Sequence, residues 1–302
     1  MSKLEDQTNA PLPQLRPRAA DSNKGDFGKA LLVGGSRGMS GAIALAGMST
    51  LRSGAGLVTL AVPSAVQEVV AGFEPSYMTH ALADYEGQFA VGAADEVIGF
   101  AQNATALALG PGLGRTPSLT DFVAKLYCEI TEPMVVDADA LFALSERLKV
   151  MERPGGPRVL TPHPGEFARL AGSLPEDSQR VDAAAEFAKR DATRQTVLVL
   201  KGKGTVVTDG ERFSINSTGN PGMATGGSGD VLTGIITALL CQGLSPFDAA
   251  RLGVHLHGLA GDLAADALGE VSLIARDLID YLPKAFQTVA KLSAGDARIG
   301  FA

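Results

Sequence analysis

Short segments that are apolar at almost every position place the strongest constraint on the fold of this chain. They recur at Ala30–Val33, Leu57–Val62, Thr105–Leu109, Met134–Val136, Arg158–Leu160 and Thr196–Leu200. Strands whose apolar residues do not alternate with polar ones are buried on both faces, which is typical of a parallel sheet covered by helices. Helical patterns such as Ser40–Arg52 lie between them. We therefore predict an α/β domain of three layers, α-β-α, around a mostly parallel central sheet.

The pattern changes after Thr205. Val206–Thr208, a turn at Asp209-Gly210 and Phe213–Ile215 predict a β-hairpin. Helices are predicted over residues 228–241, 246–268 and 275–292. The sequence contains no evident interdomain linker and no internal repeat, so residues 24–302 are expected to form one domain.

Charge narrows the class of protein. The chain has 26 basic and 33 acidic residues, a formal net charge of −7 and no basic tract, which argues against a nucleic-acid partner. No run of 18 apolar residues occurs, so no membrane span is predicted. An anionic ligand would have to be bound by backbone N–H groups and a few well-placed cations. The composition is typical of a cytoplasmic α/β enzyme.

Residues 1–23 are polar, contain prolines and lack the apolar core of a secretory signal, so we expect a flexible leader. Cys128 and Cys241 are the only cysteines and form no C-x-x-C pair. This excludes a cysteine zinc site, and buried free thiols are expected rather than a disulfide.

Glycines or polar residues directly follow the ends of several predicted strands. In open α/β sheets, ligands bind at the carboxyl ends of the strands. The chain has neither a Walker A motif nor G-x-G-x-x-G, so an ordinary P-loop or Rossmann site is not expected. His255 and His257 fit no common zinc signature and are expected to lie within a helix, one packed and one near the surface.

The glycine-rich segment Thr218–Asp230 leads into the predicted helix 228–241. Unhindered N–H groups at a helix N-terminus form an anion site, so Gly227, Ser228 and Gly229 are candidate phosphate donors. The alternative is an ordinary turn in which Ser228 or Asp230 caps the helix. Asp230 would also suit a general base beside a bound phosphate.

The segment Lys201-Gly202-Lys203-Gly204-Thr205 follows a buried strand and could approach phosphate oxygens closely. Surface lysines on a tight turn are the alternative. The Gly110–Gly114 loop carries no acid or base, so close backbone approach to a ligand is its expected role.

Two further loops carry side chains with possible chemistry. His163 lies between two prolines and would be either a ligand contact or a buried structural histidine. Asp137 and Asp139 could hold Mg²⁺ through water, or Asp139 could cap the following helix. The sequence identifies no certain metal ligand.

Together these motifs resemble the ADP/ATP-dependent NAD(P)H-hydrate dehydratases of the ribokinase-like superfamily. The matching segments run in the family's order and are Lys24–Gly28, Gly34–Ser36, Ser40–Ala42, Gly110–Gly114, Val136–Ala140, Thr161–Glu166, Lys201–Thr205 and Asn220–Asp230. The resemblance implies a ribokinase-like fold and a metabolite-repair lyase. Such an enzyme removes water from the S epimer of hydrated NADH or NADPH, while ADP, or ATP in eukaryotic members, is consumed.

The resemblance also implies roles for individual residues. Asp230 would be the base that activates the ring hydroxyl of the hydrate, and Ala42, Gly114, His163 and Asp230 would line the hydrate site. Lys201, Gly202, Lys203, Gly204, Thr205, Gly227, Ser228 and Gly229 would bind the nucleotide. Mg²⁺ is expected with the nucleotide, and a homotetramer is expected from the family.

Many bacterial relatives carry an N-terminal epimerase domain, whereas only about 23 residues precede the matching core here. We expect no epimerase activity and a possible separate epimerase partner. The alternatives are a ribokinase-like small-molecule kinase, of the hydroxymethylpyrimidine or hydroxyethylthiazole type, and a nucleotide-binding sensor without turnover. A choice between NADH and NADPH hydrate would need a cation near the 2′-phosphate, and Arg37, Arg52 and Arg115 are unranked candidates.

Overall fold

The computed structural model describes residues 4–90 and 92–299, with the backbone alone for 292–299. Its centre is one ten-stranded sheet in the order β1-β12-β11-β10-β9-β8-β7-β2-β3-β4. The strands are β1 (Glu5–Asp6), β2 (Lys29–Val33), β3 (Leu57–Pro63), β4 (Met78–Leu82), β7 (Ala106–Leu109), β8 (Met134–Val136), β9 (Arg158–Leu160), β10 (Thr196–Leu200), β11 (Val206–Thr208) and β12 (Arg212–Ile215). All neighbours pair in parallel except β11, which is antiparallel to both β10 and β12. A separate hairpin joins β5 (Asp84–Tyr85) to β6 (Gln88–Phe89).

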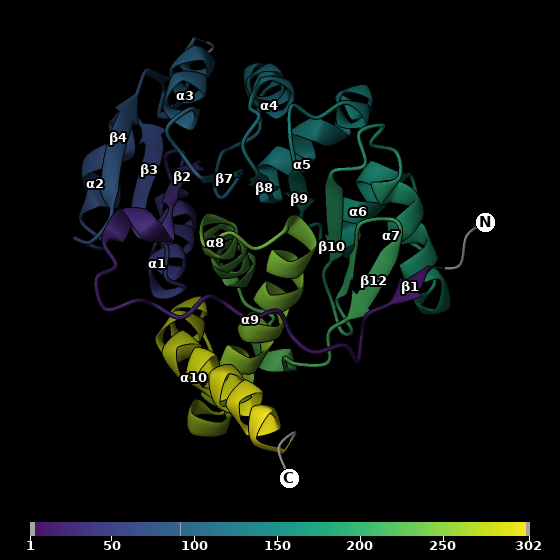
Figure 1. The fold of residues 1–302 in the computed structure, drawn as a ribbon. Helices are drawn as coiled ribbons and strands as arrows, with labels where there is room; N and C mark the ends of the chain where they lie inside the picture. The colour runs from purple at the N-terminus through teal and green to yellow at the C-terminus, as the bar shows by residue number, and fades with distance from the viewer. Residues whose placement is uncertain (1–3, 91, 300–302) are drawn as a thin grey trace.

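Helices cover both faces of this sheet (Figure 1). One face packs against α1 (Ser40–Arg52), α2 (Gln67–Ala71), α8 (Ser228–Cys241), α9 (Pro246–Leu268) and α10 (Ala275–Ile299). The other packs against α3 (Ala93–Ala101), α4 (Pro117–Glu129), α5 (Ala138–Ser145), α6 (Pro164–Ala171) and α7 (Arg180–Ala188). The predicted three-layer α/β architecture is confirmed. Within the described ranges, no helix is both long enough and apolar enough to cross a membrane.

Strand β2 shows why the apolar segments predict this fold. Ala30 and Leu32 point into the core beneath α1 and α8, whereas Leu31 and Val33 point into the core beneath α4 and α5. All four side chains are buried because both faces are covered. The predicted hairpin is β11–β12, and α1, α8 and α9 begin and end at the predicted residues. Helices α3, α4, α6 and α7 were not predicted.

The N-terminal segment, which the sequence predicts to be a flexible leader, contacts the rest of the chain from residue 4 onward. Residues 5–6 add strand β1 to β12, and Arg251 donates to the carbonyl oxygens of Ala10 and Pro11. Arg18 donates to the Gly54 carbonyl oxygen at 2.8 Å and stacks on Phe27. From residue 4 to residue 23 the chain thus lies against the domain, because distant carbonyls and an open sheet edge bind it.

The cysteine prediction is half right. Both thiols are free, and Cys241 is buried, but Cys128 is exposed. Cys128 lies near the end of α4 and is not among the residues of that helix that are buried.

Candidate active site

The carboxyl edge of the sheet brings one buried cation to several carboxylates. Lys201 follows β10, and its Nζ lies 2.9 Å from Oδ1 of Asp137, which follows β8. The same Nζ lies 4.0 Å from Glu166, beyond the end of β9. The Asp137 side chain is only 1% exposed and that of Lys201 only 19%. The Lys201 side chain is therefore an internal charge held by acids, contrary to the surface-lysine alternative.

Asp137 connects this cation to helix α8. Its second oxygen, Oδ2, accepts a hydrogen bond of 2.8 Å from the hydroxyl of Thr233, which is fully buried in α8. The backbone turns sharply just beyond Asp137, because Ala138 has a positive φ of 50°. Gly110 is required beside this turn, since a Cβ there would lie 1.9 Å from the Asp137 carbonyl oxygen. The ends of β7, β8 and β10 and the helix α8 are thus locked together.

No side chain caps the start of helix α8, where the N–H of Ser228 makes only a long hydrogen bond of 3.4 Å to the carbonyl oxygen of Thr225. Gly227 is its N-cap in the left-handed conformation, with φ at 90°, and no side chain accepts a hydrogen bond there. The alternative in which Ser228 or Asp230 caps the helix is therefore wrong. A Cβ at Gly229 would lie 3.3 Å from Lys201 Nζ, so the ammonium group lies beside the first turn. The positive end of the helix dipole, the backbone N–H groups of the first turn and a neighbouring lysine together favour the binding of an anion here.

A histidine supports the first turn of α8 from behind. His257, on α9, lies with Nε2 2.9 Å from the Ser228 carbonyl oxygen and 3.3 Å from its hydroxyl. Burial lowers the pKa of His257 to about 4, so the ring is neutral at pH 7 and Nε2 donates to the carbonyl. Both His255 and His257 lie within α9 as predicted, but both are half-buried.

Asp230 has the properties of a general base. Burial is the larger cause that raises its pKa to about 7, and the negative charge of Asp137 adds to it, whereas Lys201 opposes the rise. A base with a pKa near the working pH transfers protons most effectively. Asp230 in the first turn of α8 lies beside the anion-binding N–H groups, so it would face a hydroxyl that attacks a bound phosphate.

The loop Lys201–Thr205 is clamped from behind by Arg180, at the start of α7. Its guanidinium donates to the carbonyl oxygens of Lys203 at 2.7 Å, Lys201 at 3.1 Å and Leu200 at 3.2 Å. The φ angles of Gly202 and Gly204, 130° and 65°, turn the chain so that these carbonyls face one arginine. The side chain of Lys203 is exposed, so the surface-lysine alternative fits this residue only.

The His163 side chain is exposed and hydrogen-bonded, which excludes the buried structural histidine. It is the N-cap of α6, where its Nδ1 accepts from the N–H of Gly165 at 3.0 Å and of Glu166 at 3.3 Å. Glu166 accepts in return from the N–H of His163 at 2.8 Å. The His163 side chain is 57% exposed. Partial burial, as the larger cause, and the charge of Lys201 lower the pKa of His163. Its Nε2 lies 3.4 Å from Oε1 of Glu166.

The Gly110–Gly114 loop contacts the start of α1. A Cβ at Gly112 would lie 2.5 Å from the Met39 carbonyl oxygen and 3.1 Å from the Cβ of Ala42. Asp139 accepts from the N–H of Gly114 at 2.9 Å and from Arg115 Nε at 2.6 Å, so it fixes this loop instead of capping α5. These contacts place Ala42 and Gly114 at the same edge as Asp230.

Some of these residues were missed by the sequence prediction. Arg180, Thr233 and His257 support the candidate residues from elements that lie elsewhere in the sequence, and no local motif marks them. Across residues 4–90 and 92–299, no three His, Cys, Asp or Glu side chains are arranged to hold a metal ion by themselves.

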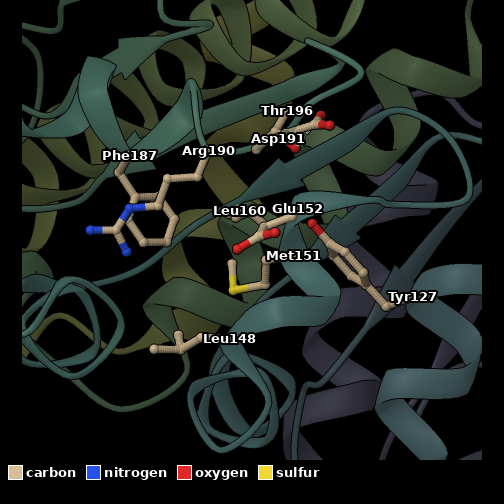
Figure 2. A pocket seen from close by; sticks show the side chains of 9 residues that line it. All are labelled: Tyr127, Leu148, Met151, Glu152, Leu160, Phe187, Arg190, Asp191 and Thr196. Carbon is tan, nitrogen blue, oxygen red and sulfur yellow. Dashed lines mark hydrogen bonds between the residues drawn. The ribbon is translucent and has the colours of Figure 1, made fainter.

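A small cavity lies away from this edge (Figure 2). It has a volume of about 70 Å³, and Thr196 in its wall is the first residue of β10, whereas Lys201 follows the last. The residues that line the cavity include none of the candidate site residues, so it is separate from the candidate site.

Comparison with known proteins identifies the family of this chain. Residues 30–284 match the family model described as NAD(P)H-hydrate dehydratase. The ADP-dependent (S)-NAD(P)H-hydrate dehydratase of Bacillus subtilis is 37% identical over 289 residues, which are 94% of this chain and 96% of that protein. The bifunctional NAD(P)H-hydrate repair enzyme of Moorella thermoacetica is 48% identical over 275 residues, which are 89% of this chain and 51% of that protein. The chain thus spans about half the length of the bifunctional relatives that it matches.

Solved structures give the same assignment. The Bacillus subtilis ADP/ATP-dependent NAD(P)H-hydrate dehydratase, co-crystallised with ATP and Mg²⁺, superposes with a TM-score of 0.75 at 33% identity, covering 96% of this chain and all of that one. Ribokinase from Arabidopsis thaliana, with a TM-score of 0.51 at 15% identity, covers 84% of this chain and 98% of that one, and shows the shared fold alone. The predicted ribokinase-like fold is confirmed, and the chain belongs to the NAD(P)H-hydrate dehydratase family.

Proposed function

We propose that this chain removes water from the S epimer of hydrated NADH or NADPH and consumes ADP in doing so. The observation that carries the proposal is Asp230, a carboxylate with a pKa of about 7 in the first turn of α8. An anion site alone would not need a carboxylate beside a phosphate, whereas phosphoryl transfer to a hydroxyl needs a base. The name of the Bacillus subtilis relative, an ADP-dependent (S)-NAD(P)H-hydrate dehydratase, supports the same reaction.

The reaction has two steps in this proposal. Asp230 accepts the proton of the ring hydroxyl as that oxygen attacks the terminal phosphorus of ADP, so an O–P bond forms and the bond to AMP breaks. The ring C–O bond then breaks and its electron pair leaves with phosphate. The neighbouring ring carbon releases a proton to solvent, and the C–H electrons form the double bond of the dihydronicotinamide. Phosphate is a better leaving group than hydroxide, which is why a nucleotide is spent.

The surrounding residues stabilise the charge that moves. The N–H groups of Gly227, Ser228 and Gly229 and the ammonium group of Lys201 would contact the transferred phosphoryl group. The backbone of Gly202–Thr205 would hold the remaining nucleotide. Ala42, Gly114 and His163 would line the hydrate side, where the His163 side chain is more than half exposed.

Mg²⁺ is proposed to arrive with the nucleotide, as the ATP and Mg²⁺ with the Bacillus subtilis structure suggest. The donor set fits, because Mg²⁺ prefers phosphate oxygens, water and one or two carboxylates. Asp137 and Glu166 are the carboxylates near Lys201, but both oxygens of Asp137 are already bonded to Lys201 and Thr233, so Asp137 would have to exchange a partner for a water of the ion. When bound, the ion would neutralise charge on the phosphates.

Product analysis tests the proposal. Purified protein is incubated with NADH hydrate, Mg²⁺ and either ADP or ATP. The absorbance of NADH should be restored, phosphate should be released, and ADP should be converted to AMP. A product that retains the phosphate would contradict the proposal in favour of the kinase alternative. Nucleotide binding with no turnover would favour a sensor. ADP rather than ATP, tetrameric assembly, a separate epimerase and a cytoplasmic location stay predictions.

A further inference from the structure

Two arginines from different elements stack on one phenylalanine at the rim of the candidate site. The guanidinium carbon of Arg115 lies 4.6 Å from the ring centroid of Phe142, and that of Arg169 lies 5.0 Å from it. Arg115 precedes α4, Phe142 is on α5 and Arg169 is on α6. Three elements that follow neighbouring strands thus place two positive charges against one aromatic ring, with Arg169 in the last turn of α6.

Both guanidinium groups are open to a ligand. The Arg115 side chain is 52% exposed, and Arg169 is exposed as well. Arg115 is anchored by its Nε, which donates to Asp139, while its terminal nitrogens make no hydrogen bond within the described part of the chain. Arg169 makes no hydrogen bond or ion pair to any residue of the same part. Stacking on Phe142 limits the freedom of both side chains, so little further ordering would be needed to bind.

The pair lies on the hydrate side of the proposed site. Arg115 directly follows Gly114, and Arg169 follows His163 on α6. The charges of Lys201, Arg169 and Arg115 all act on His163 and lower its pKa, after burial as the larger cause. Lys201 is one of the proposed nucleotide contacts. The two arginines lie on segments that carry no proposed nucleotide contact.

The carboxylates of the site would repel an anionic substrate, so a pair of cations would help to bind it. Asp137, Asp139, Glu166 and Asp230 gather at this edge of a chain whose formal net charge is −7. A dinucleotide brings a diphosphate, and NADPH brings a 2′-phosphate as well. These groups would be repelled by the carboxylates unless cations outside the cluster bind them. Paired planar guanidinium forks suit phosphate oxygens.

The other arginines considered from the sequence are less suitable. Arg52 ends α1 at the opposite edge of the sheet, and Arg37 packs against Gly87 in the β5–β6 hairpin. We infer that Arg115 and Arg169, stacked on Phe142, form a phosphate subsite for the dinucleotide part of the hydrate. This rests on the proposed function, and the phosphate is either the 2′-phosphate or the diphosphate bridge.

Steady-state kinetics test the subsite. The variants are Arg115→Gln, Arg169→Gln and the double variant, each measured with NADPH hydrate and with NADH hydrate at saturating ADP. Each single variant should lower kcat/KM by about tenfold, chiefly through KM, because a hydrogen bond to a charged group is lost. Arg169→Lys should restore part of the loss. Arg147→Gln is the matched control, since Arg147 is also 52% exposed and ion-paired, but to Asp121 on α4.

The pattern of the loss identifies the phosphate. A loss confined to NADPH hydrate assigns the 2′-phosphate, and equal losses for both substrates assign the diphosphate. Unchanged kcat/KM for both substrates in the double variant, or a rise in the KM of ADP alone, would overturn the inference. Titration of NADP⁺ and NAD⁺ without turnover separates this result from failure of the proposed function. Weaker binding in the double variant supports the subsite even if the wild type dehydrates nothing, and unchanged binding contradicts it.

Discussion

Lys201 Nζ and Asp137 Oδ1 lie 2.9 Å apart, almost out of contact with water, at the point where β10 and β8 end. Strand β9 lies between these two strands in the sheet, so the pair bridges across it. Its effect is to hold one ammonium group beside the first turn of α8 and near Asp230. Removing either partner would leave the other charge buried with fewer partners.

Asp137→Asn should therefore destabilise the fold. Breaking one side of a buried ion pair costs about 3 to 5 kcal/mol, and the low end is expected because Glu166 remains 4.0 Å from Lys201. Chemical denaturation measures the free energy of unfolding. Asp121→Asn, which breaks the exposed pair with Arg147, is the control and should cost less than about 1 kcal/mol. Equal effects of the two changes would contradict the internal role of Asp137.

Thr233→Val keeps the shape of the side chain but removes the hydroxyl that donates to Asp137. A buried acceptor that loses one donor should cost about 1 to 3 kcal/mol in unfolding free energy. Because Asp137 also orients Lys201, the KM of ADP should rise as well. Thr237→Val removes a buried hydroxyl that bonds only within α8, so it should leave the KM of ADP at the wild-type value. A shift of KM in both variants would argue against a specific link through Asp137.

Arg180→Ala should impair nucleotide binding more than chemistry. Its guanidinium holds the carbonyl oxygen of the last residue of β10 and two carbonyl oxygens of the loop that follows, and it lies behind the proposed nucleotide contacts. We expect the KM of ADP to rise by about tenfold, which corresponds to the loss of a charge-assisted hydrogen bond, while kcat changes little. Arg180→Lys should recover part of the loss. A fall in kcat at constant KM would place Arg180 in the chemical step instead.

Asp230 links catalysis and stability through pH. Its folded pKa of about 7 lies above the ordinary value of 3.8, so the folded state binds this proton more tightly than the unfolded state. The group stabilises the fold at low pH relative to high pH, and that contribution is lost as pH rises from about 3.8 to about 7. Activity follows the opposite direction, because the base must be ionised, and kcat/KM should fall on the acid side of pH 7.

Asp230→Asn separates the two effects. The neutral amide avoids burial of a charge, so the variant should be more stable than the wild type at pH 8, and this gain should shrink at pH 4. Thermal unfolding at the two pH values measures it. A variant that is less stable at pH 8 would show that the carboxylate of Asp230 is held by favourable contacts.

The sequence predicts the layers and the edge of the sheet at which the site lies, because both follow from local patterns. The strand Met134–Val136 and the helix Ser40–Arg52 are apolar or small-residue segments with clear ends, and both were predicted with their observed bounds. Strand β1 was missed because Glu5 and Asp6 are polar and are held only by the open edge of β12.

Side-chain partners were harder to predict. Lys201 and Asp137 were both singled out, but their pairing depends on the strand order, which the sequence does not state. A cap of the following helix was one of two alternatives for Asp139, which instead fixes Gly114 and Arg115. Arg180 reaches its loop from a helix that was not predicted at all.

The central claim is that Asp230 removes a proton in a nucleotide-consuming dehydration. The most direct test is kcat for NADH hydrate with ADP and Mg²⁺, measured for the wild type and for Asp230→Asn shown to be folded. We predict that the variant binds ADP as the wild type does and loses at least roughly 10²-fold in kcat, in line with the contribution of a general base. A variant that retains wild-type kcat would contradict the account.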